Sequence, residues 1–103
     1  MNELDFIIWL MKNNTSKKMC SDYVSRLKKI EHSLSDCDLD EEYSKDHCYS
    51  LLKLFDKSGQ NEKMNCRHID GLPIGKYYLA TYKYSIKKYI EFMNYFSKSN
   101  LTK

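Results

Sequence analysis

Apolar residues recur along the chain at alternating spacings of three and four, the pattern of helices that bury one face. The clearest run covers residues 16–34, where Ser16 can cap a helix whose apolar positions include Tyr23 and Leu27. A longer run covers residues 76–97, where apolar side chains again return to one side of the predicted helix. Both stretches are therefore predicted to form amphipathic helices.

Two further helices are predicted in the first half of the chain. Residues 3–13 form a short segment that is apolar on most sides, and residues 41–56 begin with two acids suited to the positive end of a helix dipole. The sequence therefore predicts an all-α fold, a compact four-helix bundle. The expected core unites six apolar side chains: Trp9, Tyr23, Leu27, Leu52, Ile86 and Ile90.

One segment breaks this helical pattern. Residues 57–75 hold all three glycines and the only proline of the chain, so we expect a long irregular loop between the third and fourth helices. This loop can include a short turn of helix and is expected to be anchored by Met64, Ile69 or Leu72. The chain has 103 residues, which suits one domain. We expect a single helical domain over residues 1–97, followed at 98–103 by a frayed tail or the start of a linker.

Charge is distributed unevenly, although the formal net charge is only +3. Residues 16–34 carry five bases against two acids, and residues 76–103 carry six bases against one acid. Residues 36–46 reverse the sign, with six acids against one lysine. Such asymmetry can orient a protein toward a polyanion, but each segment can also be an ordinary solvated helix face.

The residues that carry enzyme chemistry do not gather in the sequence. The three histidines are scattered, and there is no phosphate-binding glycine motif or paired nucleophile and base, so no catalytic centre and no cofactor are expected. The four cysteines lack metal-ligand spacing and no secretory signal precedes them. We expect reduced thiols, no metal, no membrane span and a cytoplasmic location.

Tyrosine is in excess, with nine residues, of which five fall between residues 77 and 89. A tyrosine on a helix can bury its ring and leave its hydroxyl at the rim, where it can bind a phosphate oxygen. Tyr84 lies beside Lys83 and Lys87 in the last helix, and these three predict a mixed aromatic and basic face. Tyr82 and Tyr89 fall in the apolar stripe and are expected to pack in the core.

Residues 16–31 and 79–96 together resemble the second and last helices of the N-terminal, SAM-like core-binding domain of tyrosine recombinases and phage integrases. In the first segment a serine cap is followed by a Tyr-x-x-x-Leu step formed by Tyr23 and Leu27. The second segment resembles the helix that closes the family's bundle, through Tyr82, Lys83, Ile86, Lys87 and Tyr89.

The resemblance implies a module that forms half of a clamp around duplex DNA and contacts mainly phosphates. It implies seven DNA-binding residues: Ser16, Lys17, Lys18, Ser21, Lys83, Tyr84 and Lys87. It also implies that a recombinase catalytic domain could lie C-terminal to this chain. The alternative function is a helical protein–protein interaction module, in which the surplus aromatic residues form an exposed partner patch.

Overall fold

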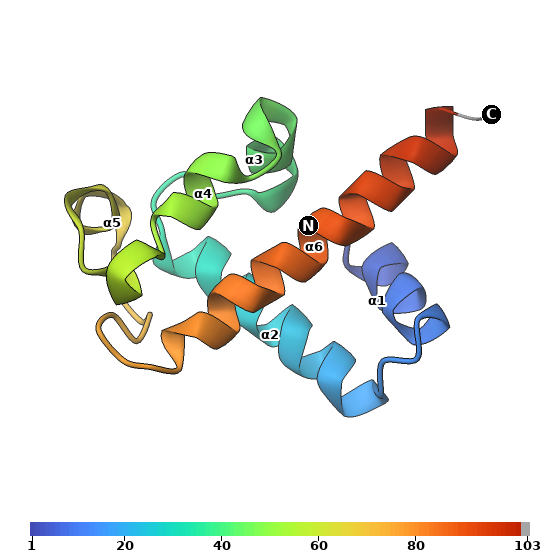
Figure 1. Cartoon of the computed structure of the whole chain (residues 1–103), viewed down its shortest axis with the longest axis horizontal. Coiled ribbons are helices and arrows are strands. Elements are labelled where there is room, and N and C mark those ends of the chain that lie inside the picture. The colour runs from blue at the N-terminus through green and yellow to red at the C-terminus, as the bar shows by residue number, and fades with distance from the viewer. Residues whose placement is uncertain (102–103) are drawn as a thin grey trace.

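The computed structural model describes residues 1–101, and all regular structure in this part of the chain is helical (Figure 1). The elements are α1 (Glu3–Lys12), α2 (Lys17–Ser33), α3 (Leu39–Asp46), α4 (Tyr49–Lys53), the 3₁₀ turn η1 (Asp56–Gly59), α5 (Glu62–Arg67) and α6 (Leu79–Leu101). The all-α prediction is confirmed. The prediction of four helices is wrong, because the third predicted helix is broken and the predicted loop contains helical turns.

Helices α2 and α6 form the centre of the fold and cross one another (Figure 1). Helix α2 begins where predicted, because the Ser16 hydroxyl accepts a hydrogen bond from the Met19 N–H at 3.2 Å and so satisfies a free donor of the first turn. Leu27 of α2 and Ile86 of α6 are both completely buried. Helix α1 packs against both central helices.

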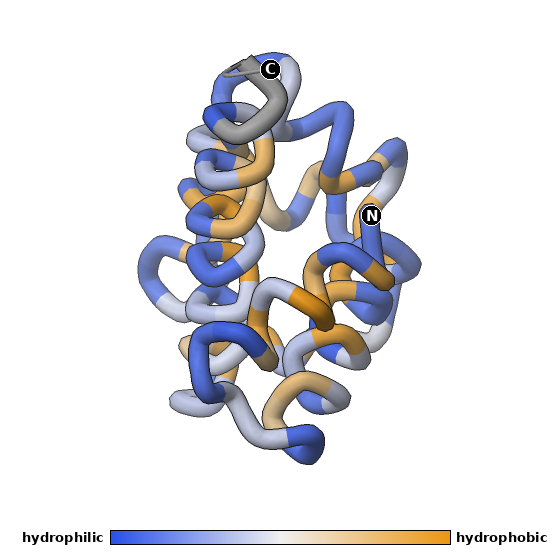
Figure 2. The backbone as a smooth tube through the Cα atoms, turned by 90° about the vertical axis from the view of Figure 1, so that its right-hand side faces the viewer, coloured by the Kyte–Doolittle hydropathy of each residue, from blue (hydrophilic) through white to orange (hydrophobic). Residues whose placement is uncertain are grey.

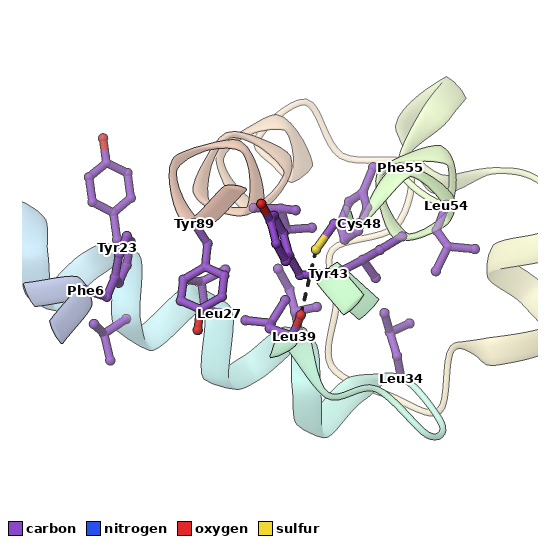
Figure 3. Close-up of a cluster of buried hydrophobic side chains, with 14 of the residues drawn as sticks. Phe6, Tyr23, Leu27, Leu34, Leu39, Tyr43, Cys48, Leu54, Phe55 and Tyr89 are labelled. Carbon is purple, nitrogen blue, oxygen red and sulfur yellow. Dashed lines mark hydrogen bonds between the residues drawn. The ribbon is translucent and has the colours of Figure 1, made fainter. Parts of the chain in front are cut away.

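Aromatic side chains fill the space between α1 and α6. The ring centroid of Phe6 lies 5.1 Å from that of Tyr89 and 5.5 Å from that of Phe92, in edge-to-face and tilted arrangements that aromatic pairs favour. Figure 3 shows the Tyr89 ring reaching from α6 toward Leu27 on α2. Burial raises the pKa of the Tyr89 hydroxyl, and its hydrogen bond to the Asp40 carboxylate raises it further.

The predicted core residues are buried at the centre of the fold, but those at its edge are only half-buried. Three of its six members are buried, namely Tyr23, Leu27 and Ile86, and the other three, Trp9, Leu52 and Ile90, are half-buried against them. These three lie where α1, α4 and α6 meet the surface. One continuous core still joins residues from all parts of the described chain.

The helix predicted over residues 41–56 breaks at His47 and Cys48. Both residues have left-handed backbone angles, with φ values of 55° and 64°. The break satisfies the end of α3, because the His47 N–H donates to the Tyr43 carbonyl at 2.8 Å and the Cys48 N–H donates to the Glu42 carbonyl at 3.1 Å. The new direction of the chain buries four side chains: Cys48, Leu51, Leu54 and Phe55.

The predicted loop at 57–75 contains the short turn of helix that the sequence allowed. Helix α5 lies inside it, capped by the Asn61 side chain, which accepts a hydrogen bond from the Met64 N–H at 2.9 Å. Met64 is completely buried and anchors the segment to the core. Gly59 has φ of 79°, and a Cβ there would lie 3.0 Å from side-chain atoms of both Ile74 and Leu79, so glycine suits this tight approach.

The last helix is displaced relative to its predicted bounds. It begins at Leu79 rather than near residue 76 and continues past residue 97 to Leu101. The predicted tail at 98–103 therefore starts within α6, and residues 102–103 lie outside the described residues. Figure 2 shows hydrophobic and hydrophilic positions interspersed along the tube, and no described helix is long and apolar enough to cross a membrane.

Candidate nucleic-acid interface

Lys83 and Lys87, which lie one turn apart on α6, line a hollow between α4 and α6. The opposite wall comes from α4 and the start of η1. The full lining, which we call the α4–α6 hollow, is Tyr49, Leu52, Lys53, Asp56, Lys83 and Lys87. Three lysine side chains from two separate segments therefore line one surface depression.

A single carboxylate lies among these lysines. The Lys83 Nζ is 3.3 Å from Asp56 Oδ1, and the Lys53 Nζ is 3.9 Å from Asp56 Oδ2. All three side chains are partly exposed, so each ion pair is weak and its lysine remains accessible to another anion. Three lysines against one aspartate leave the α4–α6 hollow with an excess of two positive charges.

An exposed aromatic ring lies at the edge of this hollow. Tyr49 is 61% exposed, and the Lys53 Nζ lies 5.2 Å from the centroid of its ring, within the range of a cation–π contact. This arrangement holds the Lys53 ammonium near the surface, and the Tyr49 hydroxyl adds a hydrogen-bond donor. Both groups can contact a phosphate or sugar of a bound nucleic acid.

Positive charge continues from this hollow toward α5. Lys53 also lines a neighbouring hollow, which it shares with Lys57 and Lys63 and with the acids Asp56 and Glu62. The lysines of the two hollows, which we call the basic strip, are Lys53, Lys57, Lys63, Lys83 and Lys87. A strip of this kind suits an extended polyanion better than a compact ligand.

Sequence reasoning did not find the α4 side of this site. The predicted helix over residues 41–56 contains both Tyr49 and Lys53, and nothing in its local pattern indicates that this segment turns toward α6. The break at residues 47–48 contains no glycine or proline, which are the usual signals of such a turn.

The four DNA-binding residues predicted at the start of α2 lie outside the α4–α6 hollow. Lys17 and Ser21 line a groove between α1 and α2, which does not include any residue of α6. The Ser16 hydroxyl is engaged in the helix cap, and Lys18 is exposed. The structure thus places Lys17 and Ser21 in one groove and the predicted lysines of α6, Lys83 and Lys87, in a separate hollow.

Tyr84 is not part of the α4–α6 hollow. It lies on the side of α6 that faces α2, with its ring centroid 6.1 Å from that of Tyr23 and 5.9 Å from the Lys88 ammonium. Burial raises the pKa of the Tyr23 hydroxyl, and the neighbouring Tyr84 raises it further. The predicted face of Lys83, Tyr84 and Lys87 is therefore divided, since the two lysines face α4 and the tyrosine faces α2.

Four other side chains that could carry chemistry, Cys37, Cys48, Arg67 and His68, are partly or fully buried or hydrogen-bonded within the fold. Burial raises the pKa of the Cys37 and Cys48 thiols to about 12, so both are protonated at neutral pH. Arg67 donates hydrogen bonds to the Ser35 carbonyl, and the His68 imidazole accepts one from the Leu72 N–H at 3.2 Å. Among the described residues, no group of three potential ligands is placed to hold a metal ion.

Comparisons with known proteins do not assign this chain to a family. A scan against protein-family models found no match, and searches of curated proteins and of solved structures found no match either.

Proposed function

We propose that this chain is a duplex-DNA-binding module that contacts phosphates through the basic strip, with the α4–α6 hollow at its centre. The observation that carries the proposal is the convergence of Lys53 from α4 with Lys83 and Lys87 from α6 around one exposed depression. Lysine ammoniums neutralise backbone phosphates without reading sequence, so the expected binding is largely independent of base sequence.

We further propose that the module serves as the SAM-like core-binding domain of a tyrosine recombinase or integrase, which would place a catalytic domain C-terminal to it. The resemblance of α2 and α6 to two helices of that family supports this finer assignment. The DNA-binding proposal does not depend on the family, because it rests on the lysines themselves.

The direct test is a titration of a fluorescently labelled duplex with the chain over a series of salt concentrations. The expected dissociation constant is about 10⁻⁴–10⁻⁶ M, and log affinity should fall by about 0.9 per phosphate contact for each unit of log salt. A scrambled duplex of the same length should bind equally well. If no duplex binds at low salt, the proposal is wrong and the protein–protein interaction module becomes the better hypothesis.

Asp56 offers a more specific test, because its carboxylate occupies the position among the lysines that a phosphate would take. Replacing Asp56 with asparagine removes one negative charge and releases Lys83 and Lys53 from their ion pairs. Duplex affinity is expected to rise about three- to tenfold, as each exposed ion pair costs little to break. The same fluorescence titration measures this change.

Asp70→Asn is the matched control for this substitution, because it makes the same change of charge at an exposed residue that lines neither hollow. It should change duplex affinity less than twofold if the effect is local. Weaker binding by the Asp56→Asn variant would show instead that the carboxylate positions the lysines for DNA.

A further inference from the structure

An exposed apolar stripe runs along α1, from the outer face of the helix to the edge of its groove with α2, which Met11 lines. Its members are Leu4, Ile8 and Met11, which are 70%, 43% and 47% exposed. Their spacings of four and three place them on one face of the helix, whereas Phe6 and Leu10 are buried on the other. A helix of ten residues thus presents apolar side chains on two faces, of which only one is covered within the described chain.

Two opposite charges flank this outer stripe. Asp5 and Lys12 are both exposed, and neither side chain forms an ion pair within the described residues. They are seven residues apart, which is close to two helical turns of about 3.6 residues, so they lie on the same side of the stripe. The acid is near the start of α1 and the base is at its end.

We propose that a second copy of this chain packs antiparallel against α1 about a two-fold axis. In this arrangement Ile8 packs on Ile8 of the partner subunit, and Asp5 faces Lys12 of the partner subunit, twice by symmetry. A parallel arrangement about a two-fold axis would place the two copies of each charge on opposite flanks of the contact, so no acid would face a base. The charge pattern of α1 is therefore complementary to itself only in the antiparallel orientation.

The proposed dimer surface is separate from the proposed DNA interface. Helices α1 and α4 lie on opposite sides of α6, so a copy bound at α1 leaves the α4–α6 hollow open (Figure 1). The stripe is smaller than the ~800 Å² per partner of a standard interface, so we expect a weak dimer with a dissociation constant of about 10 μM to 1 mM. This inference goes beyond DNA binding and does not depend on it.

Sedimentation equilibrium without DNA, from about 10 μM to 2 mM chain, spans the expected dissociation range. The unmodified chain should pass from monomer to dimer. Asp5→Lys and Lys12→Asp should each weaken the dimer at least about tenfold, because each variant opposes like charges across the axis. An equimolar mixture of the two variants should form a heterodimer near the original strength, since every facing pair then has opposite signs.

This mixing experiment separates pairing from helix stability. Both substitutions oppose the dipole of α1, so a mere loss of helix would persist in the mixture and would be greatest in the Asp5→Lys/Lys12→Asp double variant. Pairing instead predicts that the double variant dimerises again. Circular dichroism of each variant reports the helix content directly.

Ile8→Asp tests the apolar contact, because it places two carboxylates at the two-fold axis and should abolish the dimer. Ile69→Asp is the matched control, as Ile69 is 66% exposed and lies outside α1. A chain that stays monomeric up to 2 mM overturns the proposal. So does a dimer that survives both Ile8→Asp and the single charge reversals.

Discussion

Replacing Lys83 and Lys87 together with alanine is expected to weaken duplex-DNA binding about 60-fold at roughly 0.1 M salt, because each lost phosphate contact removes about 0.9 units from the salt slope. Both ammoniums line the α4–α6 hollow, and Lys87 is exposed. The salt dependence should become shallower by about 1.8 in the same step. Fluorescence anisotropy of a labelled duplex over a salt series measures both quantities.

The matched control for this variant is Lys17→Ala/Lys18→Ala, which removes the same charge from the start of α2. These lysines do not line the α4–α6 hollow, so a much smaller loss is expected if that hollow is the main contact. Equal losses in the two variants would show that DNA contacts both the start of α2 and the lysines of α6, as the family resemblance implies. Unchanged affinity and slope in the Lys83/Lys87 variant would show that α6 does not contact DNA.

The melting temperature separates a binding defect from a folding defect in these variants. Lys83 forms an exposed ion pair with Asp56, and such pairs contribute little to stability. The double variant should therefore melt within a few degrees of the parent. If the variant instead melts at a much lower temperature, its weaker DNA binding would be caused by unfolding.

Replacing Leu27 with alanine is expected to lower the free energy of unfolding by about 2–5 kcal/mol, through lost burial and the cavity left behind. Leu27 is completely buried on α2, and Figure 3 shows it below the Tyr89 ring of α6. The cavity would open at the contact between the two central helices, where neighbouring side chains have little freedom to collapse. Urea denaturation followed by circular dichroism measures the loss.

Ser25→Ala provides the comparison on the same helix, because Ser25 is exposed and the change should stay within about 0.5 kcal/mol of the parent. A loss below about 1 kcal/mol for Leu27→Ala would contradict its place in the core. The packing of α2 on α6 would then need to be revised.

The local pattern of the sequence determined the long central helices. The serine cap at Ser16 and the apolar positions through Ile30 placed α2 within one residue at each end. The stripe of α6 was equally clear and identified Ile86 and Tyr89 as buried. These features could be predicted because capping and helical periodicity depend on residues only a few positions apart.

Tertiary packing alone decided the break at His47 and Cys48 and the site that follows from it. Left-handed backbone at two residues that are not glycine costs conformational energy, and no local signal predicts it. Burial of Cys48, Leu51 and other side chains offsets that cost only when α2 and α6 are in place. The same turn brings Lys53 beside the lysines of α6, so the basic strip exists only in the folded chain, because its members come from segments far apart in sequence.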